Sequence, residues 1–120
     1  MFYTYRQNNS GGFFKITKKI KHYVIIEADS AKEADEKAES IDLYFDGVKK
    51  DIDCPCCGDR WSRADDPGCG IEGTKEPEIW GQSVLKYLKE KEWSLWEEEA
   101  IVYYKNGKIE VFSEKDLYDK

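Results

Sequence analysis

The residues best suited to chemistry in this 120-residue chain are four cysteines, three of which fall within four positions. Residues 54–58 read CPCCG, which is the C-P-x-C-G form of a zinc knuckle. At this spacing the thiolates of Cys54 and Cys57 can converge on one tetrahedral ion. A structural zinc site would take its other ligands from Cys69 and from His22 or Cys56. The alternative is a set of reduced cysteines packed under a loop, because the chain has no second C-x-x-C pair.

An arginine and a tryptophan follow the cysteines directly, in the run Gly58-Asp59-Arg60-Trp61. The guanidinium of Arg60 offers a planar fork to phosphate or carboxylate, and the ring of Trp61 offers a face to a nucleotide base. Such a pair is typical of a nucleotide pocket. In the alternative interpretation Asp59 and Arg60 pair at the surface while Trp61 fills the core, where large aromatic residues usually lie.

A second polar segment lies near the N-terminus, where residues 6–12 read RQNNSGG. Five side chains able to form hydrogen bonds precede two glycines, whose backbone N–H groups can cradle a phosphate. The segment lacks the spacing and the following helix of a Walker or dinucleotide fingerprint. The alternative is a polar hairpin loop, although a hairpin needs only about two to five loop residues. The ligand-binding candidates in this segment are Arg6, Asn8, Asn9, Ser10 and Gly11.

The residue pattern gives little support to catalysis. The single histidine, His22, opens an apolar segment, where a structural role is expected, and no G-x-S-x-G nucleophile elbow is present. Aspartates are numerous between residues 46 and 66, but nothing in their spacing selects a pair. We therefore predict a binding protein that is not an enzyme and requires no cofactor. Hydrolysis of a nucleotide through metal-assisted aspartates is a third hypothesis.

Strands must position these groups. Residues 2–6 alternate rings with polar side chains, and residues 13–16 resume an apolar pattern after the polar turn. The sequence therefore predicts an N-terminal hairpin. The run 23–28 is the most apolar of the chain and predicts a central strand.

One helix is expected after this central strand. Ser30 and Glu33 form a capping box, and alanines then recur at helical spacing, so the helix should begin at Ser30 and end near Ser40. Asp42 stands where a glycine would be expected at the helix C-terminus. Residues 43–48 then return the chain to the core.

The second half of the chain contains a long irregular segment, residues 50–78, rich in Asp, Gly, Pro and Cys. A loop of this length in a compact domain is usually functional. Residues 80–91 predict a short strand and a helix. Residues 100–112 predict a hairpin, because Asn-Gly at its centre suits a type I′ turn. The tail 113–120 is expected to add a helical turn.

Together these elements predict a single α+β domain over residues 1–120. Its sheet should be mostly antiparallel with hairpins, with one main helix packed on a face and a long Cys-containing loop. The formal charge of −6 and the pI near 4.9 argue against binding of duplex nucleic acid. No apolar stretch approaches the ~18 residues of a membrane span, and we expect a cytoplasmic protein. A local basic group that suits a small anionic ligand comprises Lys15, Lys18, Lys19 and Lys21.

Two blocks of the sequence resemble a family of small tailed-phage proteins. The first block is FYTYRQNNSGG at residues 2–12. The second is LYFDGV at residues 43–48 followed by DCPCCGDRW at residues 53–61. The resemblance covers roughly the first half of the chain, and Asp42 departs from it because a glycine is expected there.

Small phage proteins of this kind are often inhibitors of bacterial defence. The resemblance implies a sponge that sequesters the cyclic nucleotide signals of CBASS-type immunity without turnover, in the host bacterial cytoplasm. Small sponges can also share a pocket across a two-fold axis, so a homo-oligomer is expected. The alternative is an acidic inhibitor directed at a defence protein or a nucleic-acid-binding protein. In the sponge hypothesis Arg6, Asn8, Asn9, Ser10 and Gly11 surround phosphate and sugar, Arg60 takes a second phosphate, and Trp61 with Tyr3 or Tyr5 stacks bases.

Overall fold

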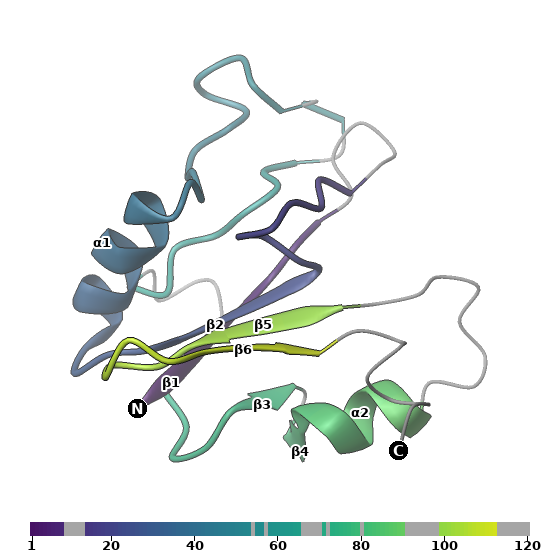
Figure 1. Ribbon diagram of the computed structural model, residues 1–120. Helices are drawn as coiled ribbons and strands as arrows, with labels where there is room; N and C mark the ends of the chain where they lie inside the picture. The colour runs from purple at the N-terminus through teal and green to yellow at the C-terminus, as the bar shows by residue number, and fades with distance from the viewer. Residues whose placement is uncertain are drawn as a thin grey trace.

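The computed structural model describes residues 1–8, 14–53, 55–56, 58–65, 71, 73–79, 81–90 and 99–112. Within these residues the main sheet contains β1 (Phe2–Arg6), β2 (Tyr23–Glu27), β5 (Ala100–Tyr103) and β6 (Ile109–Phe112). A smaller sheet contains β3 (Glu78–Ile79) and β4 (Gln82–Ser83), and the helices are α1 (Ala31–Ser40) and α2 (Val84–Glu90) (Figure 1). The fold is therefore α+β, as the sequence predicts.

The main sheet has the strand order β1-β2-β5-β6 and is mixed. β1 pairs antiparallel with β2, and β5 pairs antiparallel with β6, but β2 and β5 run parallel. The sequence prediction lacks this parallel contact. A parallel pair needs a long crossover connection, and here the connection contains α1, the small sheet and α2.

Side chains of the main sheet are buried on both of its faces. Successive strand residues point to opposite faces, so Tyr5 and Val24 belong to one buried cluster and Ile25 to another. Ala38 of α1 lies in the first cluster and Val84 of α2 in the second. We call these sides of the sheet the α1 face and the α2 face. β2 is buried from both sides, which suits its run of β-branched residues.

Both ends of α1 follow from local sequence signals. The Ser30 hydroxyl accepts a hydrogen bond from the Glu33 N–H at 3.1 Å, as the predicted capping box requires. At the other end Asp42 takes a left-handed φ of 78°, the conformation for which a glycine was expected. The Leu43 and Asp42 N–H groups donate to the carbonyls of Ala38 and Glu39, which completes a Schellman motif without a glycine.

We expect the Ser30→Ala variant to lower the free energy of unfolding by about 1 kcal/mol, because the Glu33 N–H loses its partner. Urea unfolding followed by circular dichroism measures this change. Ser62→Ala is the matched control, since Ser62 is exposed in an irregular segment outside the helix. Equal midpoints for the two variants would show that the cap contributes nothing.

The predicted N-terminal hairpin is wrong. The described part of its second strand, residues 14–16, forms no strand, and β1 pairs instead with β2. The side chain of Gln7 explains the arrangement, because it accepts from the Lys15 N–H at 2.6 Å and donates to the Lys15 carbonyl at 3.1 Å. The Gln7 side chain thus holds this segment next to the end of β1, and the more apolar β2 forms the backbone hydrogen bonds with β1.

The predicted C-terminal hairpin is confirmed, but its turn type is wrong. β5 and β6 pair in register from Ala100–Phe112 to Tyr103–Ile109. Gly107 has a φ of 94°, whereas Asn106 does not have the positive φ that a type I′ turn requires. The Gly107 N–H donates to the Tyr104 carbonyl, which is typical of a three-residue loop with a left-handed glycine. The short strand and helix predicted within residues 80–91 are confirmed as β4 and α2, whereas the tail 113–120 lies outside the described residues.

Candidate functional site

The structure brings together the two polar segments that the sequence singles out. The Asn8 N–H donates to the Arg60 carbonyl at 2.9 Å, and the Asn8 side-chain amide donates to the Asp59 carbonyl at 3.2 Å. Arg6 lies partly exposed at the end of β1. Asn9, Ser10 and Gly11 lie outside the described residues.

The guanidinium of Arg60 is buried within a polar network, with only 2% of the side chain exposed. Its Nε lies 3.8 Å from Asp53 and donates to the Tyr44 hydroxyl at 3.1 Å, and one of its terminal nitrogens donates to Gln7 at 3.1 Å. Asp53 in turn accepts from Tyr44 at 2.6 Å and from the Arg60 N–H at 2.8 Å. A Cβ on Gly47 would stand 1.8 Å from this carboxylate, so the network requires a glycine there.

This network contradicts the alternative interpretation in which Asp59 and Arg60 form an ion pair at the surface. Arg60 does not pair with Asp59 at the surface, because its ionic partner is the buried Asp53. The Asp59 carboxylate instead accepts from the Val48 N–H at 2.9 Å. Asp59 is the expected partner because it is next to Arg60 in the sequence. In the fold the partner is instead Asp53, whose carboxylate is buried.

The three aromatic residues proposed to stack bases all lie in the cluster on the α1 face. Trp61 is 2% exposed, Tyr5 is 1% exposed, and Tyr3 is also buried. The Tyr5 hydroxyl donates to Asp35 at 2.7 Å, and burial is the largest cause of its raised pKa. In this arrangement none of the three rings presents an open face to a ligand.

The zinc hypothesis gains no support from the described residues. Cys54, Cys57 and Cys69 lie outside them, Cys56 is an exposed free thiol, and no cluster of metal-binding side chains is present in the described part of the chain. His22 accepts a hydrogen bond from the Glu99 N–H through Nδ1 at 3.1 Å.

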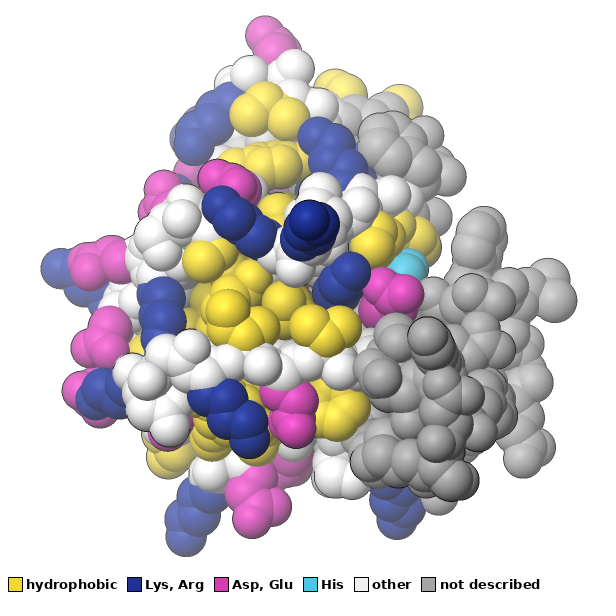
Figure 2. Space-filling model, in the orientation of Figure 1, with side chains coloured by type: hydrophobic (Ala, Val, Ile, Leu, Met, Phe, Trp, Pro, Cys, Tyr) yellow, Lys and Arg dark blue, Asp and Glu magenta, His cyan; other side chains and the backbone are white. Residues whose placement is uncertain are grey.

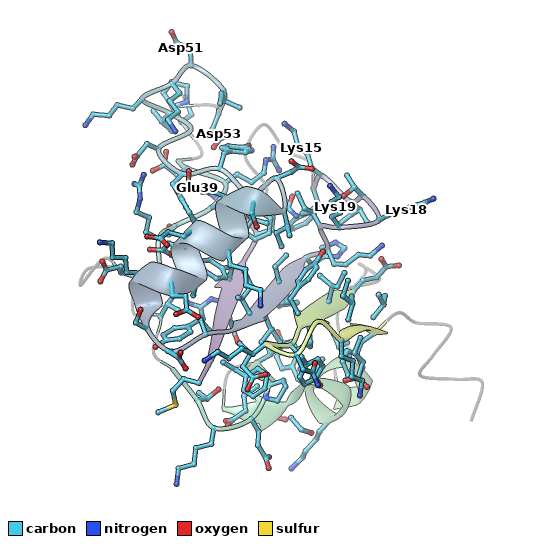
Figure 3. All side chains as sticks on the ribbon, turned by 60° about the vertical axis from the view of Figure 1, so that its left-hand side comes forward. Lys15, Lys18, Lys19, Glu39, Asp51 and Asp53 are labelled. Atoms are coloured by element: carbon cyan, nitrogen blue, oxygen red, sulfur yellow. The ribbon has the colours of Figure 1, made fainter. Side chains whose placement is uncertain are left out.

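All four lysines singled out by sequence belong to the segment between β1 and β2. Figure 3 shows three of them, Lys15, Lys18 and Lys19, extending from it. Lys15 lies 5.5 Å from the centre of the Tyr44 ring. Lys19 pairs with Asp42 and Lys21 with Glu99, both at 3.4 Å. Lys15, Lys19 and Lys21 therefore each contact a different local partner and do not share one binding site.

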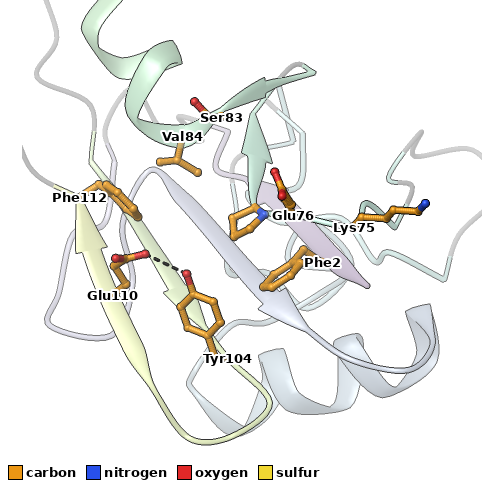
Figure 4. Close-up of a pocket in the computed structure, with 9 residues that line it drawn as sticks. Phe2, Lys75, Glu76, Ser83, Val84, Tyr104, Glu110 and Phe112 are labelled. Carbon is orange, nitrogen blue, oxygen red and sulfur yellow. Dashed lines mark hydrogen bonds between the residues drawn. The ribbon is translucent and has the colours of Figure 1, made fainter.

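An open cleft of about 420 Å³ lies on the α2 face, away from the predicted site (Figure 4). It is bounded by strands of the main sheet, by the segment before β3 and by the start of α2. The rings of Phe2 and Tyr104 meet edge to face with their centres 5.7 Å apart, and Phe112 lines the opposite end. The lining residues are Phe2, Lys75, Glu76, Pro77, Ser83, Val84, Tyr104, Glu110 and Phe112.

One carboxylate in the cleft has a fixed orientation. The Tyr104 hydroxyl donates to Glu110 at 2.9 Å (Figure 4). Burial, this hydrogen bond and the nearby carboxylate charge raise the pKa of Tyr104 to about 12, so the hydroxyl stays protonated at neutral pH. Two cations lie at the margin, because Lys75 lines the cleft and the Lys108 ammonium stands 5.1 Å from the centre of the Tyr104 ring.

Sequence reasoning missed this cleft because its walls come from distant segments. Phe2 and Phe112 belong to the outermost strands of the main sheet, β1 and β6, and only the strand order places them on one face. The available signal was the alternation along β6, which puts Glu110 and Phe112 on the side opposite to Ile109 and Val111.

These features define a small α+β protein with a mixed sheet, buried on both faces, and an aromatic cleft on one of them. Residues 1–118 match the family described as Domain of unknown function (DUF7296), so the chain belongs to that family. No curated protein and no solved structure matches the chain. Within its described residues, neither helix has the length and apolarity to cross a membrane.

Proposed function

We propose that this protein binds a nucleotide in the α2-face cleft and releases it chemically unchanged. The observation that carries the proposal is the cleft, whose volume of about 420 Å³ is large enough for a small-molecule site. Two partly exposed rings, Tyr104 and Phe112, line it beside the buried Phe2. Stacking of a base on an aromatic ring contributes ~1–3 kcal/mol.

The polar groups at the cleft suit the two ends of a nucleotide. Glu110, held by the Tyr104 hydroxyl, is an acceptor for the N–H groups on the edge of a base. Lys75 and Lys108 stand at the margin, where a phosphate that projects from the cleft would meet a cation. The apolar walls favour retention of a planar ring over chemistry on it.

The resemblance to small tailed-phage proteins suggests which nucleotide is bound. We infer a cyclic nucleotide signal of bacterial anti-phage defence, sequestered in the host cytoplasm as a form of immune evasion. Sequestration needs affinity but no turnover, so the proposal requires no catalytic residue and no cofactor. The proposal places the ligand away from Arg60 and Trp61. The guanidinium of Arg60 already has buried polar partners, and the ring of Trp61 is buried in the core.

The test is isothermal titration calorimetry of the purified chain with a panel of cyclic nucleotides, with native mass spectrometry to show that the bound nucleotide is intact. We expect at least one nucleotide to bind. Phe112→Ala should weaken that binding by roughly 5- to 150-fold, the equivalent of one stacking contact. Ile52→Ala removes an exposed apolar side chain elsewhere and should leave the affinity unchanged.

Three results would contradict the proposal. A chain that ignores the whole panel at micromolar concentration would favour an inhibitor directed at a protein. A nucleotide converted to product would favour the hydrolase hypothesis. Binding that survives Phe112→Ala but is lost in Asn8→Ala would keep the nucleotide and return the site to the N-terminal polar segment.

A further inference from the structure

Glu110 and Phe112 lie side by side on one wall of the cleft (Figure 4). They stand opposite Val102 and Ala100 of β5, which belong to the cluster on the α2 face. Both side chains therefore point to that face, and they lie ~7 Å apart because a strand rises ~3.4 Å per residue. A planar ring packed against Phe112 thus brings its edge within reach of the Glu110 carboxylate.

The Glu110 carboxylate offers acceptors only, and it is held in one orientation. The Tyr104 hydroxyl donates to one of its oxygens at 2.9 Å. Among the described residues this hydroxyl is the only hydrogen-bond partner of the Glu110 side chain. An ionised carboxylate has about four acceptor positions, so both oxygens keep lone pairs for a ligand. The other carboxylate that lines the cleft, Glu76, is exposed at its margin.

The nucleotide bases differ in the donors that they can offer to such a carboxylate. Guanine carries two N–H donors side by side, N1–H and the N2 amino group, which match the two oxygens of a carboxylate. Adenine and cytosine place an unprotonated ring nitrogen next to their amino group, and uracil places a carbonyl on each side of its N–H. In each of those bases an acceptor would face a carboxylate oxygen with no proton between them, which is costly away from water.

The cations near the cleft disfavour a cationic ligand and suit a phosphate. The Lys108 ammonium already stands 5.1 Å from the centre of the Tyr104 ring, and Lys75 lines the cleft, so a ligand cation would meet like charge. The chain as a whole has a formal charge of −6, and Figure 2 shows acidic and basic side chains interspersed over the described part of the visible face. An anionic ligand therefore depends on local cations such as these two lysines.

We propose that the cleft selects guanine, whose N1–H and N2 amino group donate to Glu110. This inference rests on the proposed function and adds to it the identity of the base. Tyr104 is then a positioning residue, because its hydroxyl holds the carboxylate that reads the base. Phe112 stacks on any base, so its ring contributes affinity without selectivity.

The probes are cyclic nucleotides that differ in their bases: cyclic GMP, cyclic IMP and cyclic AMP, together with cyclic di-GMP and cyclic di-AMP. Isothermal titration calorimetry measures their affinities for the purified chain. We expect each guanine nucleotide to bind roughly 10- to 150-fold more tightly than its adenine counterpart, the equivalent of one hydrogen bond to a charged group. Cyclic IMP, which keeps N1–H and lacks the N2 amino group, should fall between cyclic GMP and cyclic AMP.

Substitutions in the cleft assign the selectivity to one side chain. Glu110→Gln keeps the length of the side chain but replaces one acceptor by a donor, which suits adenine, so the guanine preference should disappear or reverse. Tyr104→Phe keeps the ring and frees the carboxylate, so the preference should shrink. Phe112→Ala should weaken guanine and adenine nucleotides alike. Glu36→Gln is the matched control, because it makes the same change of charge on the exposed surface of α1 and should leave the preference unchanged.

Circular dichroism confirms that the variants are folded, and the outcomes separate this inference from the proposed function. Equal affinities of guanine and adenine nucleotides would overturn the selection of guanine while nucleotide binding stands. A guanine preference that persists in Glu110→Gln, or that falls as much in Glu36→Gln, would also overturn it, because another group or the net charge would then explain the preference. A chain that binds none of these nucleotides would overturn both proposals.

Discussion

We expect the Arg60→Ala variant to lose about 3–5 kcal/mol of its free energy of unfolding, the usual cost of removing one partner of a buried ion pair. The variant leaves the Asp53 carboxylate without its cation, although its side chain is only 1% exposed. It also removes the donors that Arg60 gives to Tyr44 and Gln7. Urea unfolding followed by circular dichroism measures the effect.

The matched control is Arg63→Ala. Arg63 pairs with Asp46 at 2.6 Å, but these side chains are 40% and 43% exposed. Solvent screens such a pair, so we expect a much smaller loss of stability despite the shorter distance. If Arg60→Ala were as stable as Arg63→Ala, the buried network would not hold the loops together. Arg60 would then be free to take a phosphate, as the sequence predicts.

Local signals in the sequence were sufficient for the elements that depend on neighbouring residues. The helix α1 follows from Ser30 and Glu33, which meet within one turn, and the C-terminal hairpin follows from Asn106 and Gly107 between two strand-forming runs. Each of these elements is stabilised by contacts within a few residues, so pattern and spacing identify it. Even there the turn type was wrong, because the backbone of Asn106 does not follow its statistical preference.

Contacts between distant segments could not be predicted in this way. The parallel pairing of β2 with β5 depends on which apolar strands reach each other after α1 has formed, and periodicity carries no information on that choice. The same reason explains the predicted site. Asn8 and Arg60 do meet, but the partners that bury Arg60 are Asp53, which lies in the irregular segment, and Tyr44. The residue type of Arg60 indicated a phosphate ligand, whereas in the folded protein its guanidinium lies beside the carboxylate of Asp53.

A variant can lose ligand binding because it lacks a contact with the ligand or because it no longer folds. The stability and binding predictions together distinguish these two causes. In the sponge hypothesis drawn from the sequence, alanine at Arg60 or Trp61 abolishes binding and leaves the fold intact. In the structure both side chains are nearly inaccessible, so the same substitutions act first on stability. Binding measurements on these variants are therefore informative only beside an unfolding curve, whereas Phe112, on the opposite face, can be changed without entering the α1-face cluster.

Trp61→Ala should destabilise the protein by about 3–5 kcal/mol, the cost of deleting a large aromatic side chain from a core. The ring is 2% exposed and belongs to the same cluster as Tyr5 and Phe45, two rings whose centres lie 6.1 Å apart. The substitution removes the contacts of the ring and leaves a cavity that these neighbours can only partly fill. Chemical denaturation gives the free energy, and the slope with denaturant shows whether the folded state stays compact.

Ile52→Ala provides the comparison, because Ile52 is 51% exposed in the irregular segment that precedes Trp61. Surface substitutions of this kind usually change stability by less than about 0.5 kcal/mol. A Trp61→Ala protein as stable as Ile52→Ala would show that the ring is not part of the core in solution. Stacking on a base would then again be its best explanation, and the cleft would lose its priority as the ligand site. A large loss confined to Trp61→Ala would instead assign the tryptophan to folding and leave the rings of the α2 face as the place for a ligand.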